Sequence, residues 1–151
     1  MGMNITLDTN IFLNVKNKEK PFYSYSNLIL EEIDNEKSIL HGIISIISLT
    51  ELSLGYYKNK EIIEKDEFIS GLYSNKKYKI RDLNINIADK ASEIRSQINL
   101  KLPDCIIVAT ALIENSEILI TNDIEFKNKA ESLIEIYNSQ DFYEKFLKKK
   151  D

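Results

Sequence analysis

The chain has 151 residues, of which 43% are hydrophobic and 29% charged, and these proportions are typical of a single globular domain over residues 1–151. A formal net charge of −4 gives no overall attraction for nucleic acid, so such a contact has to come from a local basic patch. The single cysteine excludes an internal disulfide and a cysteine-based zinc site, and it suits a reducing, cytoplasmic environment. No apolar stretch reaches the roughly 18 residues of a membrane span, so we expect no membrane partner.

Short apolar runs alternate with amphipathic segments along the chain. The predicted strands lie at residues 4–7, 39–47, 78–83, 117–121 and 133–137. The predicted helices lie at residues 9–15, 23–35, 49–60, 61–73, 84–98 and 105–113, and a last one runs from a cap at Ser139 to the lysines at 148–150. This alternation predicts an α/β fold, in which a central parallel sheet of about five strands lies between two helical layers.

Four carboxylates stand at turning points of this pattern. Asp8 ends the first predicted strand, and Asp123 follows the fourth within Thr-Asn-Asp. Glu51 lies in Ser-Leu-Thr-Glu, and Asp104 follows a proline at a helix start. Functional groups gather outside the carboxyl ends of strands in open parallel sheets. Because clustered acids repel one another unless a cation binds among them, the pattern predicts a site for metal-assisted cleavage of a phosphodiester.

Each acid also has a purely structural interpretation. Asp8 can cap a helix, Asp104 can interact with a helix dipole, and Asp123 can be a turn residue. The spacing in Ser48-Leu49-Thr50-Glu51 is that of a capping box. If that helix begins earlier, at Ser45, the capping box is lost and the glutamate faces inward from the second turn. Taken together, the structural interpretations require four coincidences.

Short motifs surround the acids in a fixed order. They are Leu7-Asp8-Thr9-Asn10, Thr50-Glu51-Leu52, Leu102-Pro103-Asp104 followed by Ala109-Thr110-Ala111, and Thr121-Asn122-Asp123 with Phe126. In this order, and over nearly the whole chain, they resemble the PIN-domain family of nucleases, of the VapC toxin type. The resemblance implies a doubly wound sheet whose acids bind one or two Mg²⁺ or Mn²⁺ ions and activate a water for RNA hydrolysis.

The resemblance also implies roles for particular residues. The catalytic and metal-binding acids would be Asp8, Glu51, Asp104 and Asp123. Thr121 corresponds to a hydroxyl residue that holds a site carboxylate, and Asn10 to a polar neighbour of the first acid. Glu125 lies where members often have a further acid, which we expect to support the site without binding the metal. The chain is somewhat longer than compact members, and we expect the additional residues near 58–79.

Partners follow from the same resemblance. Small PIN domains of this type pair into homodimers with a shared RNA groove, and a toxin has an antitoxin partner. Aromatic and apolar residues of the helices at 49–60 and 61–73 are a candidate surface for either partner, although they can equally pack the two helices together. With a negative net charge, phosphate contacts would come from basic residues flanking the acids, and the candidates are Lys16, Lys18, Lys20, Arg95 and Lys101.

Other chemistries and roles were weighed against this interpretation. His41, the only histidine, is expected in a strand without a catalytic role, and Cys105 in the core. No glycine-rich phosphate-binding motif occurs. A phosphoacceptor receiver domain would need paired acids after the first strand, where this chain has Asp-Thr-Asn. A stand-alone RNA-processing nuclease and a catalytically silent PIN-like binding module both remain open, because they share these residues.

Overall fold

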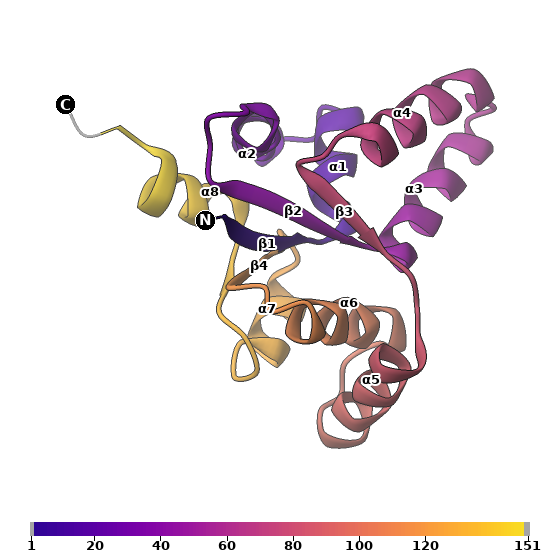
Figure 1. The fold of residues 1–151 in the computed structure, drawn as a ribbon, viewed down its shortest axis with the longest axis vertical. Coiled ribbons are helices and arrows are strands. Elements are labelled where there is room, and N and C mark those ends of the chain that lie inside the picture. Colours follow the sequence, from indigo (N-terminus) through magenta and orange to yellow (C-terminus); the bar gives the residue numbers. More distant parts are fainter. Residues whose placement is uncertain (1, 150–151) are drawn as a thin grey trace.

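A computed structural model of the chain describes residues 2–149 and contains one five-stranded sheet between two layers of helices (Figure 1). The strands are β1 (Met3–Leu7), β2 (Leu40–Ser45), β3 (Tyr78–Arg81), β4 (Ile118–Ile120) and β5 (Ile136–Tyr137). The helices are α1 (Thr9–Lys16), α2 (Tyr23–Asp34), α3 (Ile46–Lys58), α4 (Ile62–Ser74), α5 (Ile85–Gln97), α6 (Leu102–Ile113), α7 (Ile124–Ala130), α8 (Ser139–Phe142) and the π-helical turn η1 (Tyr143–Leu147). The predicted three-layer fold with parallel strands is confirmed.

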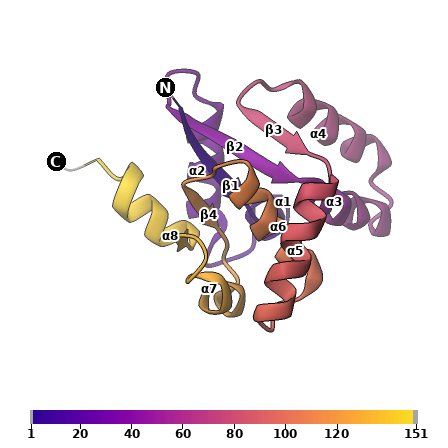
Figure 2. The same ribbon diagram turned by 60° about the horizontal axis from the view of Figure 1, so that its bottom comes forward.

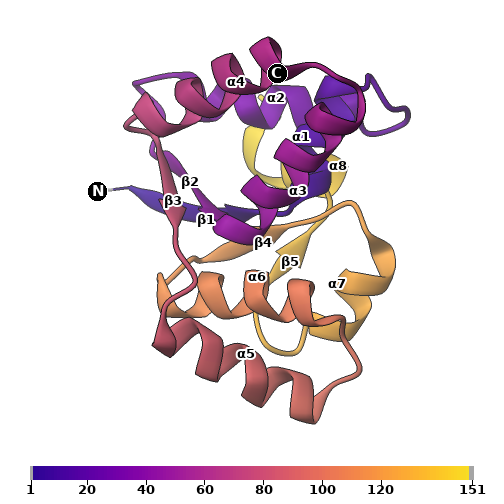
Figure 3. The same cartoon turned by 90° about the vertical axis from the view of Figure 1, so that its right-hand side faces the viewer.

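The sheet is doubly wound about β1. All its strand pairs are parallel, and their order is β3-β2-β1-β4-β5. The connections from β1 to β2 and β3 pass over one face as α1–α4, and those to β4 and β5 pass over the other as α5–α7 (Figure 3). The winding direction therefore reverses between β1 and β4, and their carboxyl ends flank a crevice where such sheets bind ligands.

Successive side chains of a strand point to opposite faces of the sheet, so the core has two halves, one on each face. In β4, Ile118 and Ile120 join the core beneath α1–α4, whereas Leu119 joins the core with α5 and α6. Figure 2 brings the α5–α7 layer forward. Helix α6 is buried from Cys105 to Ala111, as its nearly continuous apolar sequence predicts. This packing fixes the first turn of α6 at the end of the sheet.

Helix α3 begins earlier than the capping-box interpretation requires. Its N-cap is Ser45, whose side chain accepts a hydrogen bond from the backbone N of Ile47 at 3.1 Å. Ser48 is therefore inside the helix, and its buried hydroxyl has no hydrogen-bond partner among the described residues. The predicted start at residue 49 and the capping box are wrong, and Glu51 lies in the second turn.

The end of the chain also differs from the prediction. Asn138 caps α8 by accepting a hydrogen bond from the backbone N of Asp141 at 2.7 Å, so the predicted cap, Ser139, is instead the first helical residue. The helical segment ends at Leu147 rather than at the lysines, and Lys150 lies outside the described residues. Between residues 2 and 149, no helix has the length and apolarity needed to cross a membrane.

Candidate active site

The four predicted acids lie on elements that meet at the carboxyl edge of the sheet. Asp8 directly follows β1 and caps α1, and Asp123 follows β4 and caps α7. Glu51 lies on α3, above the sheet, and Asp104 in the first turn of α6, below it. Helices α3 and α6 are in contact, which closes the gap between the two layers at this edge (Figure 3).

Asp8 is the most buried of the four acids, with 6% of the residue exposed. Its Oδ1 accepts a hydrogen bond from the backbone N of Thr9 at 2.8 Å, which is the cap. Its Oδ2 accepts hydrogen bonds from Thr121 Oγ1 at 2.7 Å and from Asn10 Nδ2 at 3.2 Å. One oxygen thus serves the fold, and the other is held by the two residues predicted to support the site.

Thr121 ties the two strand ends together. Its hydroxyl, besides donating to Asp8, accepts hydrogen bonds from Asn10 Nδ2 at 3.2 Å and from the backbone N of Asp123 at 3.1 Å. The residue is 1% exposed, so water cannot replace these bonds at little cost. The hydroxyl therefore fixes the first and last acids relative to each other.

The pKa values show that the acids act on one another. Burial raises the pKa of Asp8 from 3.8 to about 7, with further increases from the charges of Asp104 and Glu51, against the lowering effect of the Thr121 hydrogen bond. Burial likewise raises the pKa of Asp104 to about 6, with additions from Asp123 and Glu51, while Lys101 lowers it. The four acids therefore form one electrostatic cluster whose ionised state is unfavourable without a counter-charge.

The carboxylates do not form a closed cage. In the described part of the chain, no three His, Cys, Asp or Glu side chains are gathered closely enough to hold a metal ion as they stand. Glu51 Oε1 instead accepts a hydrogen bond from Thr9 Oγ1 at 2.8 Å, and Asp123 Oδ1 accepts the backbone N–H groups of Glu125 and Phe126 at 3.0 and 3.1 Å. The donor set still suits Mg²⁺ or Mn²⁺, because Mg²⁺ usually keeps several waters and takes only one or two carboxylates.

A small hollow of about 30 Å³ opens between two of the acids, which is room for one or two water molecules. It is lined by residues that include Asp104, Asp123, Glu125, Lys101 and Lys129. Lys129 Nζ donates to Glu125 Oε1 at 2.8 Å, and this bond lowers the pKa of Glu125. Glu125 therefore lies beside the acids, but its carboxylate is paired with Lys129. Sequence reasoning missed Lys129, although its spacing of four residues from Glu125 on a helix was a usable signal.

The predicted phosphate-binding residues have different surroundings. Lys16 is already engaged, because its Nζ lies 3.0 Å from Glu61 Oε1 and 4.6 Å from the centre of the Tyr56 ring. The other four have exposed side chains and are Lys18, Lys20, Arg95 and Lys101. Of these, Lys101 is next to one of the acids, since it lines the hollow and lowers the pKa of Asp104.

A buried polar network behind the acids escaped the sequence analysis. Asn122 Nδ2 donates to Asn14 Oδ1 at 2.6 Å and to Ser26 Oγ at 3.1 Å. Asn122 Oδ1 accepts from the backbone N and the hydroxyl of Ser139 at 2.8 and 2.9 Å. The network joins α1, α2 and α8 to the turn that carries Thr121. One signal for this network was present in the sequence. Ser26 is a polar residue at a helical position that faces the core, on the same side of α2 as the buried Ile29 and Ile33.

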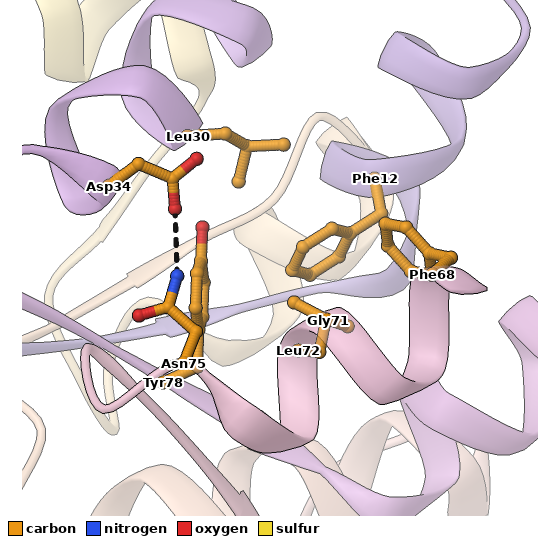
Figure 4. Close-up of a pocket in the computed structure, with 8 residues that line it drawn as sticks. All are labelled: Phe12, Leu30, Asp34, Phe68, Gly71, Leu72, Asn75 and Tyr78. Atoms are coloured by element: carbon orange, nitrogen blue, oxygen red, sulfur yellow. Dashed lines mark hydrogen bonds between the residues drawn. The ribbon is translucent and has the colours of Figure 1, made fainter. Parts of the chain in front are cut away.

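Other candidate residues and cavities lie away from the acids. His41 is near the amino end of β2, the opposite edge of the sheet, and Cys105 is fully buried in the core. A hollow of about 260 Å³ lies among α1, α2, α4 and β3 (Figure 4). In Figure 4, Asp34 and Asn75 face each other, and Asn75 Nδ2 donates to Asp34 Oδ1 at 3.1 Å. This polar pair satisfies itself beside an apolar wall, so the hollow offers no reactive group.

The raised pKa values predict how stability depends on pH. The folded protein holds the protons of Asp8 and Asp104 more tightly than the unfolded chain, so this contribution to the free energy of unfolding is complete below about pH 4 and is lost as the pH rises to about 7. Asp104→Asn removes one of these charges without breaking a side-chain hydrogen bond among the described residues. In EDTA at pH 7.5 we expect it to raise the Tm by about 3–6 °C, and at pH 4 by much less.

The control is Asp89→Asn, which changes an exposed acid on α5 and should leave the Tm unchanged at both pH values. Thermal unfolding followed by circular dichroism makes the measurement. If Asp104 only stabilises the dipole of α6, its amide variant should instead lower the Tm at pH 7.5, which would contradict the cluster.

Comparison with known proteins places this geometry in a family. The sequence matches the model of the family described as PIN domain over residues 5–132, whereas no curated protein matches it significantly. Among solved structures, VapBC2 of Rickettsia felis bound to a promoter DNA fragment is 25% identical, covers 90% of this chain and 98% of its own, and has a TM-score of 0.69. VapBC-1 of nontypeable Haemophilus influenzae is 19% identical over 91% of this chain and 99% of its own, with a TM-score of 0.70.

A third similar structure is VapC20 of Mycobacterium tuberculosis, described as a sarcin-ricin loop cleaving toxin. It is 10% identical, covers 84% of this chain and 97% of its own, and has a TM-score of 0.62. The family match spans β1 to α7 and includes all four acids, while β5, α8 and η1 follow it. The chain belongs to the PIN domain family.

Proposed function

We propose that the protein is a Mg²⁺- or Mn²⁺-dependent endoribonuclease and the toxin of a type II toxin–antitoxin pair. The observation that carries the proposal is the mutual effect of the acids, since Asp8 and Asp104 each have a pKa raised by burial and by the other site acids. Helix caps alone need no such crowding. The likeness to VapBC complexes and to a sarcin-ricin loop cleaving toxin supports the same activity.

The chain would prepare the site by holding its oxygens in place. Thr121 and Asn10 orient one oxygen of Asp8, and Thr9 orients Glu51. Glu51 and Asp123 are more exposed than Asp8, and in each the second carboxylate oxygen makes no hydrogen bond among the described residues, so that oxygen is available to an ion. When bound, the metal lowers the pKa of a water and offsets charge on the phosphate. The two acids ionise as the pH rises through about 6 for Asp104 and about 7 for Asp8, so metal affinity and activity should rise across this range.

The RNA would contact the protein through local positive charge. Lys101 lies at the hollow between Asp104 and Asp123, where it can meet a phosphate next to the scissile one, whereas Lys129 at the same hollow is paired with Glu125. Lys18, Lys20 and Arg95 are exposed and remain candidates for more distant phosphates. Lys16 is the weakest candidate, because binding RNA would break its pair with Glu61. Such contacts are independent of base sequence and weaken with salt.

A homodimer through the α3–α4 face is the second part of the proposal. Of the residues considered for this face, Tyr56, Phe68 and Leu72 are turned inward, and the Phe68 ring lies 5.9 Å from that of Phe12. These side chains therefore pack the helices together. Others remain outside, with Tyr57 53% and Tyr73 82% exposed. A hollow of about 620 Å³ runs beside Tyr73, so the face offers shape as well as apolar area.

A catalytically silent PIN-like module is the alternative function. The observation in its favour is that the described carboxylates are not gathered into a formed ion cage. In that case the acids would be tolerated only as caps and dipole partners, and RNA or protein binding would occur without cleavage.

Metal dependence tests the proposal. Protein dialysed against EDTA should not cut single-stranded RNA, and adding Mg²⁺ or Mn²⁺ should restore cutting. Asp104→Asn should lower the rate by about 100-fold or more, the scale on which one lost charge contact acts in a preorganised site. Asp89→Asn should not change the rate. A silent module would leave the RNA intact with either metal, and activity that survives exhaustive chelation would remove the metal mechanism.

Light scattering tests the dimer. At tens of micromolar we expect twice the 17.5 kDa mass of one chain. Charge placed on this face should disfavour burial, so Tyr57→Glu with Tyr73→Glu should give a monomer whose circular dichroism is unchanged. The matched control is Ile85→Glu, an 87% exposed apolar residue on α5, which should remain a dimer. A monomeric wild-type protein would leave the face to an antitoxin, and a dimeric double variant would place the interface elsewhere.

A further inference from the structure

A further hollow lies beside Thr121, the residue whose hydroxyl holds Asp8. Its volume is about 230 Å³, and it lies between the start of α2, the turn after β4, α7 and the start of α8. The residues that define it include Phe22, Thr121, Ile124, Asn128, Asn138 and Asp141. It is one of the more polar hollows of the described chain, yet it has an aromatic side chain in its wall.

The hollow and the acid cluster share a wall. Thr121 lines the hollow, and its hydroxyl binds Asp8 and accepts the backbone N–H of Asp123. Two residues span at most about 7 Å of chain, so the hollow begins within one nucleotide of Asp123. An RNA strand with its scissile phosphate at the acids therefore has a neighbouring base within reach of this opening.

The lining is suited to a base rather than to a phosphate. The Phe22 ring and the Ile124 side chain supply apolar surface on which a flat base can stack. Lys127, at the rim, is paired with Glu131 at 2.9 Å, and Asp141 contributes a negative charge that repels phosphate. A neutral, planar group with hydrogen-bond donors fits this combination better than an anion does.

The polar groups of the rim are available for a ligand. No hydrogen bond within residues 2–149 engages the side-chain amide of Asn128 or the carboxylate of Asp141, whereas the side-chain oxygen of Asn138 is used by the α8 cap. A carboxylate only accepts hydrogen bonds. The amino group of adenine, cytosine or guanine can donate to it. The one donor on the pairing edge of uracil, N3–H, lies between two carbonyl oxygens that a carboxylate repels, so uracil is disfavoured. The Asn122 side chain behind it is fully bonded and makes the wall rigid.

We propose that this hollow is a subsite for one unpaired nucleobase next to the cut, and that Asp141 makes it prefer amino-bearing bases over uracil. The inference rests on the proposed ribonuclease function and adds the source of its sequence preference. Asp141 and Phe22 are specificity residues in this account and take no part in the cleavage step.

A cleavage-independent measurement tests the subsite. The Asp104→Asn protein is titrated, with Mn²⁺ present, into fluorescein-labelled 12-nucleotide oligo(C) and oligo(U), and anisotropy is recorded. We expect oligo(C) to bind about 10-fold more tightly, the scale of one hydrogen bond to a charged group. Adding Asp141→Asn should bring the ratio close to one, and adding Phe22→Leu should weaken both RNAs by about 5-fold or more. Glu144→Gln, an exposed acid on η1, is the matched control and should change neither value.

Cleavage of a random-sequence single-stranded RNA pool by the wild-type protein separates the possible failures. A bias against uracil at one position beside the cut that is present in the wild-type protein and lost in Asp141→Asn supports the subsite. Cutting without such a bias, or a bias unchanged by Asp141→Asn, overturns the subsite and leaves the nuclease proposal standing. If neither metal supports cutting and no oligonucleotide binds, the proposed function fails and the subsite fails with it.

Discussion

The carboxyl group of Asp8 loses nearly all contact with water because β1 lies at the centre of the sheet, between β2 and β4. This burial is the largest cause of its raised pKa, and the charges of Asp104 and Glu51 raise it further. This unfavourable burial of a carboxylate occurs between β1 and β4, where the winding direction of the sheet reverses. Thr121, Asn10 and the Thr9 N–H offset part of it through hydrogen bonds. A divalent cation would offset the remainder, which links the unfavourable burial of the Asp8 carboxylate to the proposed chemistry.

The structural roles of these acids coincide with the functional roles that we propose for them. Asp8 caps a helix, as its structural interpretation predicts, whereas Asp123, for which that interpretation was a turn, caps a helix that was not predicted. Both border the crevice at the switch point. The two roles are compatible because each carboxylate has two oxygens, and in both residues the cap uses Oδ1. A cap also fixes the direction of the side chain. The caps therefore position the carboxylates in addition to stabilising α1 and α7.

The sequence was informative where a local pattern had a single physical meaning. Apolar runs and helical spacing predicted all five strands and a parallel sheet between two helical layers. The family resemblance implied that the sheet is doubly wound, and its motifs lie on elements that meet at one edge of the sheet. The start of α3 was misjudged because Ser45 and Ser48 are both good caps, and only the pairing of β2 as far as Ser45 decides between them. The Asn122 network could not be predicted, because its partners come from three helices and meet only after the chain has folded.

We propose that the four acids form one cation site. Titration of Mn²⁺ into EDTA-stripped protein at pH 7.5, followed by the loss of the free-ion signal in electron paramagnetic resonance, tests it directly and needs no substrate. We expect saturable binding of one or two ions per chain, and we expect Asp8→Asn and Asp104→Asn each to abolish the tightest site while Asp89→Asn retains it. Equal binding by all four proteins, or none by the wild type, would contradict the claim.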